Sequence, residues 1–188
     1  MPLGFHNADT SREDVSYYAV VIHMPEHLDR IIAPLRERYD PDYFFIQSHI
    51  SLVYPFETTR PLPVVSEALK QVLSDVKSLT IDLHSIGDFY PEFPLVYWSL
   101  KMNPQLDELY KSLYAKLDLA LPFKNFRPHV MVAREISSHR VVLVKEQIVP
   151  YLFEESFQAP AIDLVSPVAT RNWVSVRTFP LSTGNAGQ

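Results

Sequence analysis

The chain has 188 residues, 47% hydrophobic and 21% charged, which is ordinary for a soluble globular protein and excludes a mainly disordered one. Its formal net charge of −5 excludes broad binding along a nucleic-acid duplex, which needs a basic excess, but leaves a single nucleotide or a nucleic-acid end as a partner. Cysteine is absent, which excludes disulfides, thiolate nucleophiles and cysteine-based zinc sites.

The chain is expected to form one compact, bilobal domain. Its length suffices for one well-cored unit but hardly for two independent ones, and we place this domain at residues 15–181. Residues 1–14 are polar and irregular and are predicted to be a flexible tail, as are residues 182–188. The sequence shows no secretory signal and no apolar run of membrane-spanning length. We therefore expect a cytoplasmic monomer without membrane contact.

The first half of the chain alternates predicted strands and helices. Residues 17–22 form an apolar run that predicts a strand. Apolar residues at helical spacing from Leu28 predict a helix that residues 39–42 end and that Pro34 should kink or shorten. A second strand is predicted over 44–54, ending before a proline, and a second helix over 63–76.

The second half continues with a predicted hairpin. Its strands cover 79–86 and 93–101, with the first expected to end at Gly87. A helix is predicted over 104–117, because Asn103 can cap it and a proline takes its first position. Four further elements follow: a strand at 126–134, a segment at 138–152 that fits helix or strand but is placed as helix, and strands at 161–165 and 173–179.

Two short stretches in this order repeat one pattern. Residues 48–56 read SHISLVYPF, and residues 127–134 read RPHVMVAR. Each places a histidine in an apolar, β-branched run typical of a strand. Because successive side chains of a strand point to opposite faces, His49 shares a face with Ser51, and His129 shares a face with Met131.

The repeated order of elements predicts the fold class. A strand, a helix and a histidine strand come early, and paired strands, a helix and a histidine strand come later. This predicts an α+β fold that is bilobal and pseudo-twofold, with mainly antiparallel sheets, helices on the outer faces and a central groove carrying both histidine motifs.

Two imidazoles facing one groove are suited to cleaving a phosphodiester. One of His49 and His129 can take a proton from the attacking group while the other gives a proton to the leaving oxygen, since their ordinary pKa is near ~6.5. The Ser51 hydroxyl can donate to a phosphate oxygen, a bond typically worth ~1.5–3 kcal/mol. No metal or other cofactor is expected, because no histidine is spaced with carboxylates as metal ligands would be. Arg127 shares the face of His129 and either reaches the phosphate or stays solvated.

The runs His49–Phe56 and Phe126–Arg134 resemble the paired motifs of the 2H phosphoesterase superfamily, and most closely its 2′-5′ RNA ligase-like branch. The resemblance extends from about Tyr17 to Leu181. It implies a bilobal fold with one histidine on each side of a groove. It also implies metal-independent hydrolysis or transesterification of cyclic or 2′-5′ phosphodiesters, with a nucleotide or an RNA terminus as the partner, and hence a role in RNA processing.

Carried over position by position, the resemblance implies that His49 and His129 are the acid and the base and that Ser51 is a phosphate donor. Arg134 falls where the family places a phosphate-binding arginine, and Tyr54 falls where an aromatic side chain can stack on a base. Simple alternation puts Tyr54 and Arg134 on the face opposite the histidines, so a bend or bulge would be needed to bring them into the groove.

Met131 departs from the family, which has threonine or serine at this substrate-binding position. A thioether cannot donate a hydrogen bond, and losing one such bond costs about one to two powers of ten in rate. Met131 could instead mark a different substrate or a lobe kept for binding alone. The rival hypothesis is therefore a non-catalytic nucleotide or RNA-end binding protein, and a purely structural domain is a third. Hydrolysis or ligation, the base preference and the identity of the acid stay open.

Overall fold

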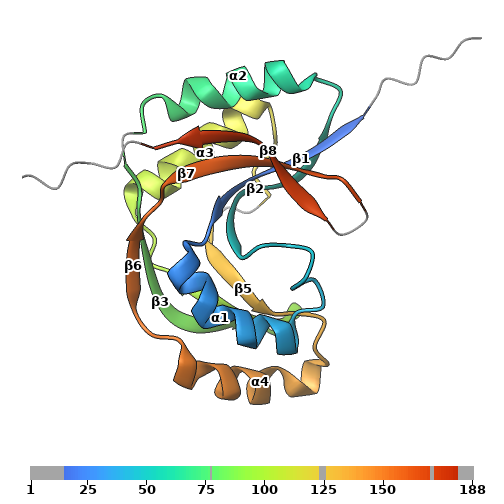
Figure 1. Cartoon of the computed structure of the whole chain (residues 1–188), viewed down its shortest axis with the longest axis vertical. Coiled ribbons are helices and arrows are strands. Elements are labelled where there is room, and N and C mark those ends of the chain that lie inside the picture. Colours follow the sequence, from blue (N-terminus) through green and yellow to red (C-terminus); the bar gives the residue numbers. More distant parts are fainter. Residues whose placement is uncertain (1–14, 77, 123–125, 170–171, 182–188) are drawn as a thin grey trace, which may run out of the picture.

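The computed structural model describes residues 15–76, 78–122, 126–169 and 172–181, so the two predicted tails lie outside the described residues (Figure 1). The strands are β1 (Ser16–His23), β2 (His49–Thr58), β3 (Thr80–Phe89), β4 (Phe93–Leu100), β5 (His129–Ala133), β6 (Glu155–Gln158), β7 (Ala161–Pro167) and β8 (Trp173–Pro180). The helices are α1 (Glu26–Tyr39), α2 (Leu62–Leu73), α3 (Pro104–Leu117) and α4 (Val141–Ile148), with 3₁₀ turns on either side of α4.

The strands form one antiparallel sheet in the order β6-β3-β4-β5-β2-β1-β7-β8. The two histidine strands, β5 and β2, are its central neighbours, and the residue pair that joins them is Ile50 with Val130. Each half of the sheet therefore has four strands and carries one histidine motif. This confirms the predicted bilobal, antiparallel α+β fold, with the two lobes sharing one curled sheet (Figure 1).

Two pairs of helices cover the sheet. Helices α1 and α4 pack on β3, β4 and β5, while α3 packs on β2 and α2 packs on α3 and β8. The apolar face of the sheet and these helices form one core, in which Ile50, Leu52, Val130 and Val132 are fully buried. The opposite face of the central strands carries the histidines, which are partly buried.

Local chemistry explains two of the helices. The Asn103 side chain accepts a hydrogen bond of 2.8 Å from the Leu106 N–H, as predicted for the N-terminus of α3. Helix α1 ends at Tyr39, as predicted, so Pro34 does not shorten it. Pro34 removes one helix hydrogen bond, and Ile32 and Arg36, which are buried on either side of it, hold the helix against the rest of the molecule.

Several predicted strand limits are also wrong. Strand β2 begins at His49, because residues 41–46 form turns in which the N–H groups of Phe45 and Ile46 donate to the Asp42 carbonyl. It then continues through Pro55, where the pairing with β1 shifts register, so that no ladder hydrogen bond is demanded of the proline. Strand β3 runs past Gly87 to Phe89, and the four-residue strand β6 was not predicted. The ambiguous segment at 138–152 is helical, as α4 and its flanking turns.

Of the helices in the described part of the chain, none has both the length and the apolar character needed to cross a bilayer.

Candidate active site

The histidines lie on the predicted face of each central strand. The core side chains described above alternate with side chains that are partly exposed on the other face: His49, Ser51, His129 and Met131. This alternation is the one expected from the period of two. It brings both motifs to one open surface of the sheet.

The pairing of β2 with β5 fixes the order of these four side chains. Because the strands are antiparallel and Ile50 pairs with Val130, His49 lies opposite Met131 and Ser51 lies opposite His129. Directly opposed side chains have Cβ atoms about 4.5–5.5 Å apart. Each histidine therefore lies across from a residue of the other motif.

The two imidazoles are held in the same way. The Nδ1 atom of His49 lies 2.8 Å from the Gln47 carbonyl oxygen, and the Nδ1 atom of His129 lies 2.8 Å from the Arg127 carbonyl oxygen. A carbonyl oxygen only accepts, so each Nδ1 must carry the proton. In the neutral ring the Nε2 atom is then a free acceptor, which is the state required of a general base.

Burial keeps both histidines neutral near pH 7. Burial, the largest cause, and the electrostatic effects of His23, Arg36 and His129 together lower the pKa of His49 to about 4. Burial also lowers the pKa of His129 below its ordinary value. The backbone hydrogen bond of each ring opposes this shift without cancelling it.

Aromatic rings surround His129. The Phe89 ring lies 5.2 Å from it, edge to face, and the Tyr97 ring lies 5.0 Å from it. Burial raises the pKa of the Tyr97 hydroxyl, and the charge of Arg127 opposes this rise. Tyr97 thus lines the histidine face, whereas Trp98 is fully buried in the core on the other side of β4.

A third histidine, His23, lies beside His49, and no sequence pattern predicted this. The two are paired across β1 and β2, and the Met24 N–H donates to the Ser48 carbonyl in the next pair. His23 and His49 thus form a non-hydrogen-bonded pair, in which side chains lie closest. Within the described residues the His23 Nδ1 atom is buried without a hydrogen-bond partner. Only the register of β1 against β2 reveals this neighbour.

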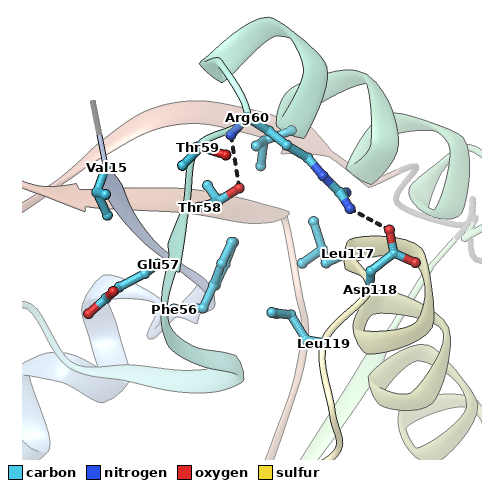
Figure 2. A pocket seen from close by; sticks show the side chains of 10 residues that line it. Val15, Phe56, Glu57, Thr58, Thr59, Arg60, Leu117, Asp118 and Leu119 are labelled. Atoms are coloured by element: carbon cyan, nitrogen blue, oxygen red, sulfur yellow. Dashed lines mark hydrogen bonds and ion pairs between the residues drawn. The ribbon is translucent and has the colours of Figure 1, made fainter. Parts of the chain in front are cut away.

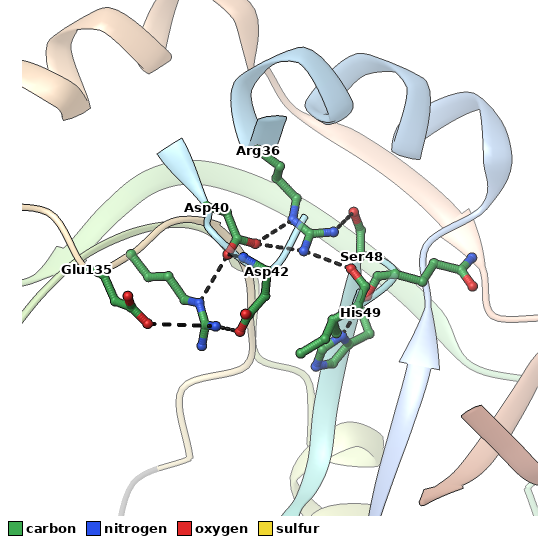
Figure 3. A network of polar contacts seen from close by, with 9 residues as sticks. Arg36, Asp40, Asp42, Ser48, His49 and Glu135 are labelled. Carbon is green, nitrogen blue, oxygen red and sulfur yellow. Dashed lines mark hydrogen bonds and ion pairs between the residues drawn. The ribbon is translucent and has the colours of Figure 1, made fainter. Parts of the chain in front are cut away.

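Arg134 lies outside the histidine row. Its Nε donates to Asp40 at 3.0 Å, and its Nη2 forms an ion pair with Asp42 (Figure 3). Its guanidinium is thereby held by two buried carboxylates. A direct role of Arg134 in phosphate binding stays a prediction.

Tyr54 lies beside helix α3. Its N–H donates to the Tyr114 hydroxyl at 3.1 Å, and burial together with Tyr110 raises the pKa of its own hydroxyl. Both partners are buried on the helix side of the sheet. Stacking of Tyr54 on a base likewise stays a prediction.

A pocket of about 370 Å³ lies at the far end of β2, between α2 and α3 (Figure 2). Its walls include Phe56, Leu117 and Leu119, and its arginine, Arg60, forms an ion pair with Asp118. None of the predicted site residues lines it. The site built from the sequence is the histidine face instead.

Comparison with known proteins relates this chain to a family and to named relatives. A family model described as the 2′-5′ RNA ligase superfamily matches residues 24–170, which include both histidine motifs. A protein of Geobacillus kaustophilus named "Putative phosphoesterase" is 26% identical over 165 residues, covering 86% of this chain and 94% of its own. A Bacillus pumilus protein of the same name is 29% identical, covering 87% and 96% respectively.

Solved structures share the fold. The crystal structure of E. coli LigT complexed with 3′-AMP matches with a TM-score of 0.65 and 15% identity, covering 90% of this chain and 99% of that one. At this identity the likeness shows the fold alone.

Proposed function

Because this chain belongs to the 2′-5′ RNA ligase superfamily, we propose that it cleaves, or reversibly forms, cyclic or 2′-5′ phosphodiesters of nucleotides or RNA ends. The family and the names of the relatives support a phosphoesterase- or ligase-type activity. The proposed chemistry is acid–base catalysis by His49 and His129 without a metal. We further propose that the protein is a monomer that acts in the cytoplasm.

The observation that carries this proposal is the matched anchoring of the two rings. Each Nδ1 is bound to the carbonyl two residues earlier, so each Nε2 is free to exchange a proton. One Nε2 accepts the proton of the attacking hydroxyl or water, whose oxygen then bonds to phosphorus. The other Nε2, protonated, gives its proton to the oxygen whose bond to phosphorus breaks. Atoms and charge balance, because the acid takes up its proton from solvent when the substrate binds and the base releases one to solvent after the reaction.

We assign His129 as the acid and His49 as the base. One ring must gain a proton when the substrate binds, and the negative phosphate favours this by raising the pKa of both rings. The charge of Arg36 and the neighbouring His23 act against protonation of His49, whose pKa is about 4. The proton therefore goes to His129. Ser51, opposite His129, donates to a phosphate oxygen in this arrangement.

The substrate class follows from the family and from what a related fold binds. LigT structures are described as complexes with 3′-AMP, ATP and NADP⁺, all of which carry a phosphate on a nucleoside. The histidine face of this chain offers two proton-exchanging groups, a hydroxyl and an aromatic wall. Nucleotides and RNA termini with a cyclic or 2′-5′ ester fit that set.

The test is turnover of 2′,3′-cyclic nucleotides, a 2′-5′ dinucleotide and RNA with a cyclic phosphate end, all in EDTA. We expect product with the wild type and a loss of at least about 10²-fold in His49→Ala and in His129→Ala, the typical worth of one acid or base. His84→Ala is the matched control, since His84 is exposed and bound to Glu154 at 2.8 Å, outside the proposed machinery.

A nucleotide-binding protein without catalysis is the second candidate, and Met131 is the observation that favours it. The thioether occupies the place that mirrors Ser51, so one half of the site has lost a donor. Tight binding of a nucleotide without product from any ester of the panel would establish that candidate. Activity that persists in both alanine variants would refute two-histidine catalysis.

A further inference from the structure

The two histidine strands are joined by few contacts of their own. The pairing of β2 with β5 rests on Ile50 and Val130, whereas β1 and β2 pair along most of their length. Catalysis by two rings, one from each strand, needs their separation to be fixed, because a misplacement of about 1 Å can cost 10²-fold in rate. A second connection between the strands is therefore needed.

A buried ion-pair network at the end of α1 meets that need (Figure 3). Its centre is Asp40, whose side chain is 2% exposed. One carboxylate oxygen accepts from Arg36 Nε at 2.9 Å and from Arg36 Nη2 at 2.7 Å. The other accepts from Arg134 Nε at 3.0 Å. Arg36 comes from the helix, and Arg134 directly follows β5.

Arg36 extends the network to the start of β2. Its Nη1 donates to the Ser48 hydroxyl at 2.8 Å, and its Nη2 donates to the Ile46 carbonyl at 2.8 Å. These two contacts lie on either side of Gln47, whose carbonyl holds the His49 Nδ1. The guanidinium thus fixes the peptide that sets the tautomer of His49.

The backbone makes the same link on the β5 side. The Arg134 N–H donates to the Tyr39 carbonyl at 3.1 Å, so the last turn of α1 is bound to the residue that ends the second motif. Paired charges inside a protein hold one geometry strongly, since loss of one partner leaves the other charge buried and unpaired. The network is suited to positioning for that reason.

We propose that Arg36 and Asp40 are positioning residues that tie the two histidine strands together and hold His49 with its proton on Nδ1. This deepens the proposed function and rests on it for the consequence in catalysis. The effect on the His49 tautomer stands on the contacts alone. In this role Arg134 serves as the end of the network on the β5 side.

The test measures the tautomers of His49 and His129 by ¹⁵N NMR in Asp40→Asn, which keeps the shape of the side chain and removes its charge. We expect the Nδ1-protonated form of His49 to fall, with that of His129 unchanged, because the Arg127 carbonyl lies outside the network. Turnover is measured alongside, with kcat expected to fall about 10-fold or more and KM to change less than about 3-fold.

The control is Arg60→Lys, which disturbs an ion pair between distant elements far from the histidines. If Asp40→Asn does not fold, Ser48→Ala decides on the same measurement, since it removes a single acceptor of Arg36. A His49 tautomer that stays as in the wild type, or equal changes at both histidines, would overturn the proposal. Absence of turnover in the wild type would refute the proposed function and leave the NMR result standing.

Discussion

Gly87→Ala tests whether the aromatic wall beside His129 is packed as described. A Cβ at Gly87 would lie 2.5 Å from Tyr97 Cζ and 2.6 Å from both Cε2 and the hydroxyl oxygen. The Tyr97 ring cannot move freely, because it is bounded by Phe89 at 4.5 Å and by His129 at 5.0 Å between ring centres. Overpacking of this kind costs about 1–3 kcal/mol in free energy of unfolding.

The assay is thermal unfolding followed by circular dichroism. The expected cost lowers Tm by about 2–4 °C for each kcal/mol in a chain of this size. Tyr97→Leu removes the ring that the new methyl group would strike, so Gly87→Ala should cost little in that background. The double-mutant cycle should give a coupling of at least ~0.5 kcal/mol. An equal cost in both backgrounds would refute the steric argument, and so would a Gly87→Ala variant as stable as the wild type.

Three further predictions follow from named contacts. The pKa of His49 is about 4 when folded and ~6.5 when unfolded, so the unfolded state binds more protons as the pH falls and the free energy of unfolding drops between pH 6.5 and 4, by up to ~3 kcal/mol. Urea unfolding at several pH values should show this drop, and His49→Gln should reduce it. An equal dependence of stability on pH in the wild type and in His49→Gln would count against the argument. Met131→Thr should raise turnover if the missing donor limits the rate; an unchanged rate would mean that the thioether suits the substrate. Asn103→Ala removes the cap on Leu106 and should cost ~0.5–2 kcal/mol in chemical denaturation with turnover retained; a neutral effect would contradict the capping role.

The faces of the histidine strands could be predicted because they depend only on the period of two along each strand. The face of each strand on which His49 or His129 lies can be assigned without knowing the neighbouring strands. That the two histidines share one surface was predicted from the repeat of the motif. The fold class could likewise be predicted, because it depends on the order of strands and helices along the chain.

The neighbours of each histidine could not be predicted, since they depend on register between strands. His23 lies opposite His49 through pairing that nothing local encodes. Arg36 and Arg134 are far apart in sequence and share one carboxylate. Long-range ion pairs of this kind leave no periodic signal.

The start of β2 was misjudged for a different reason. Residues 43–46 read YFFI, an aromatic and β-branched run that favours a buried strand. In the structure Phe44 is 77% exposed and the run forms turns. Arg36 donates a hydrogen bond to the carbonyl of Ile46, the last residue of this run. A tertiary contact from α1 thus decides the local structure.

The two halves of the histidine face are similar but not identical, because residue 51 is a serine and residue 131 is a methionine. Under the proposed function, a phosphodiester could lie on the histidine face in two opposite orientations. Ser51 beside His129 and Met131 beside His49 make these orientations differ by one hydrogen bond to a charged oxygen, or ~1.5–3 kcal/mol. That difference selects one orientation by about 10- to 100-fold. Under the proposed function, this departure from symmetry therefore helps to determine which end of an unsymmetrical ester leaves.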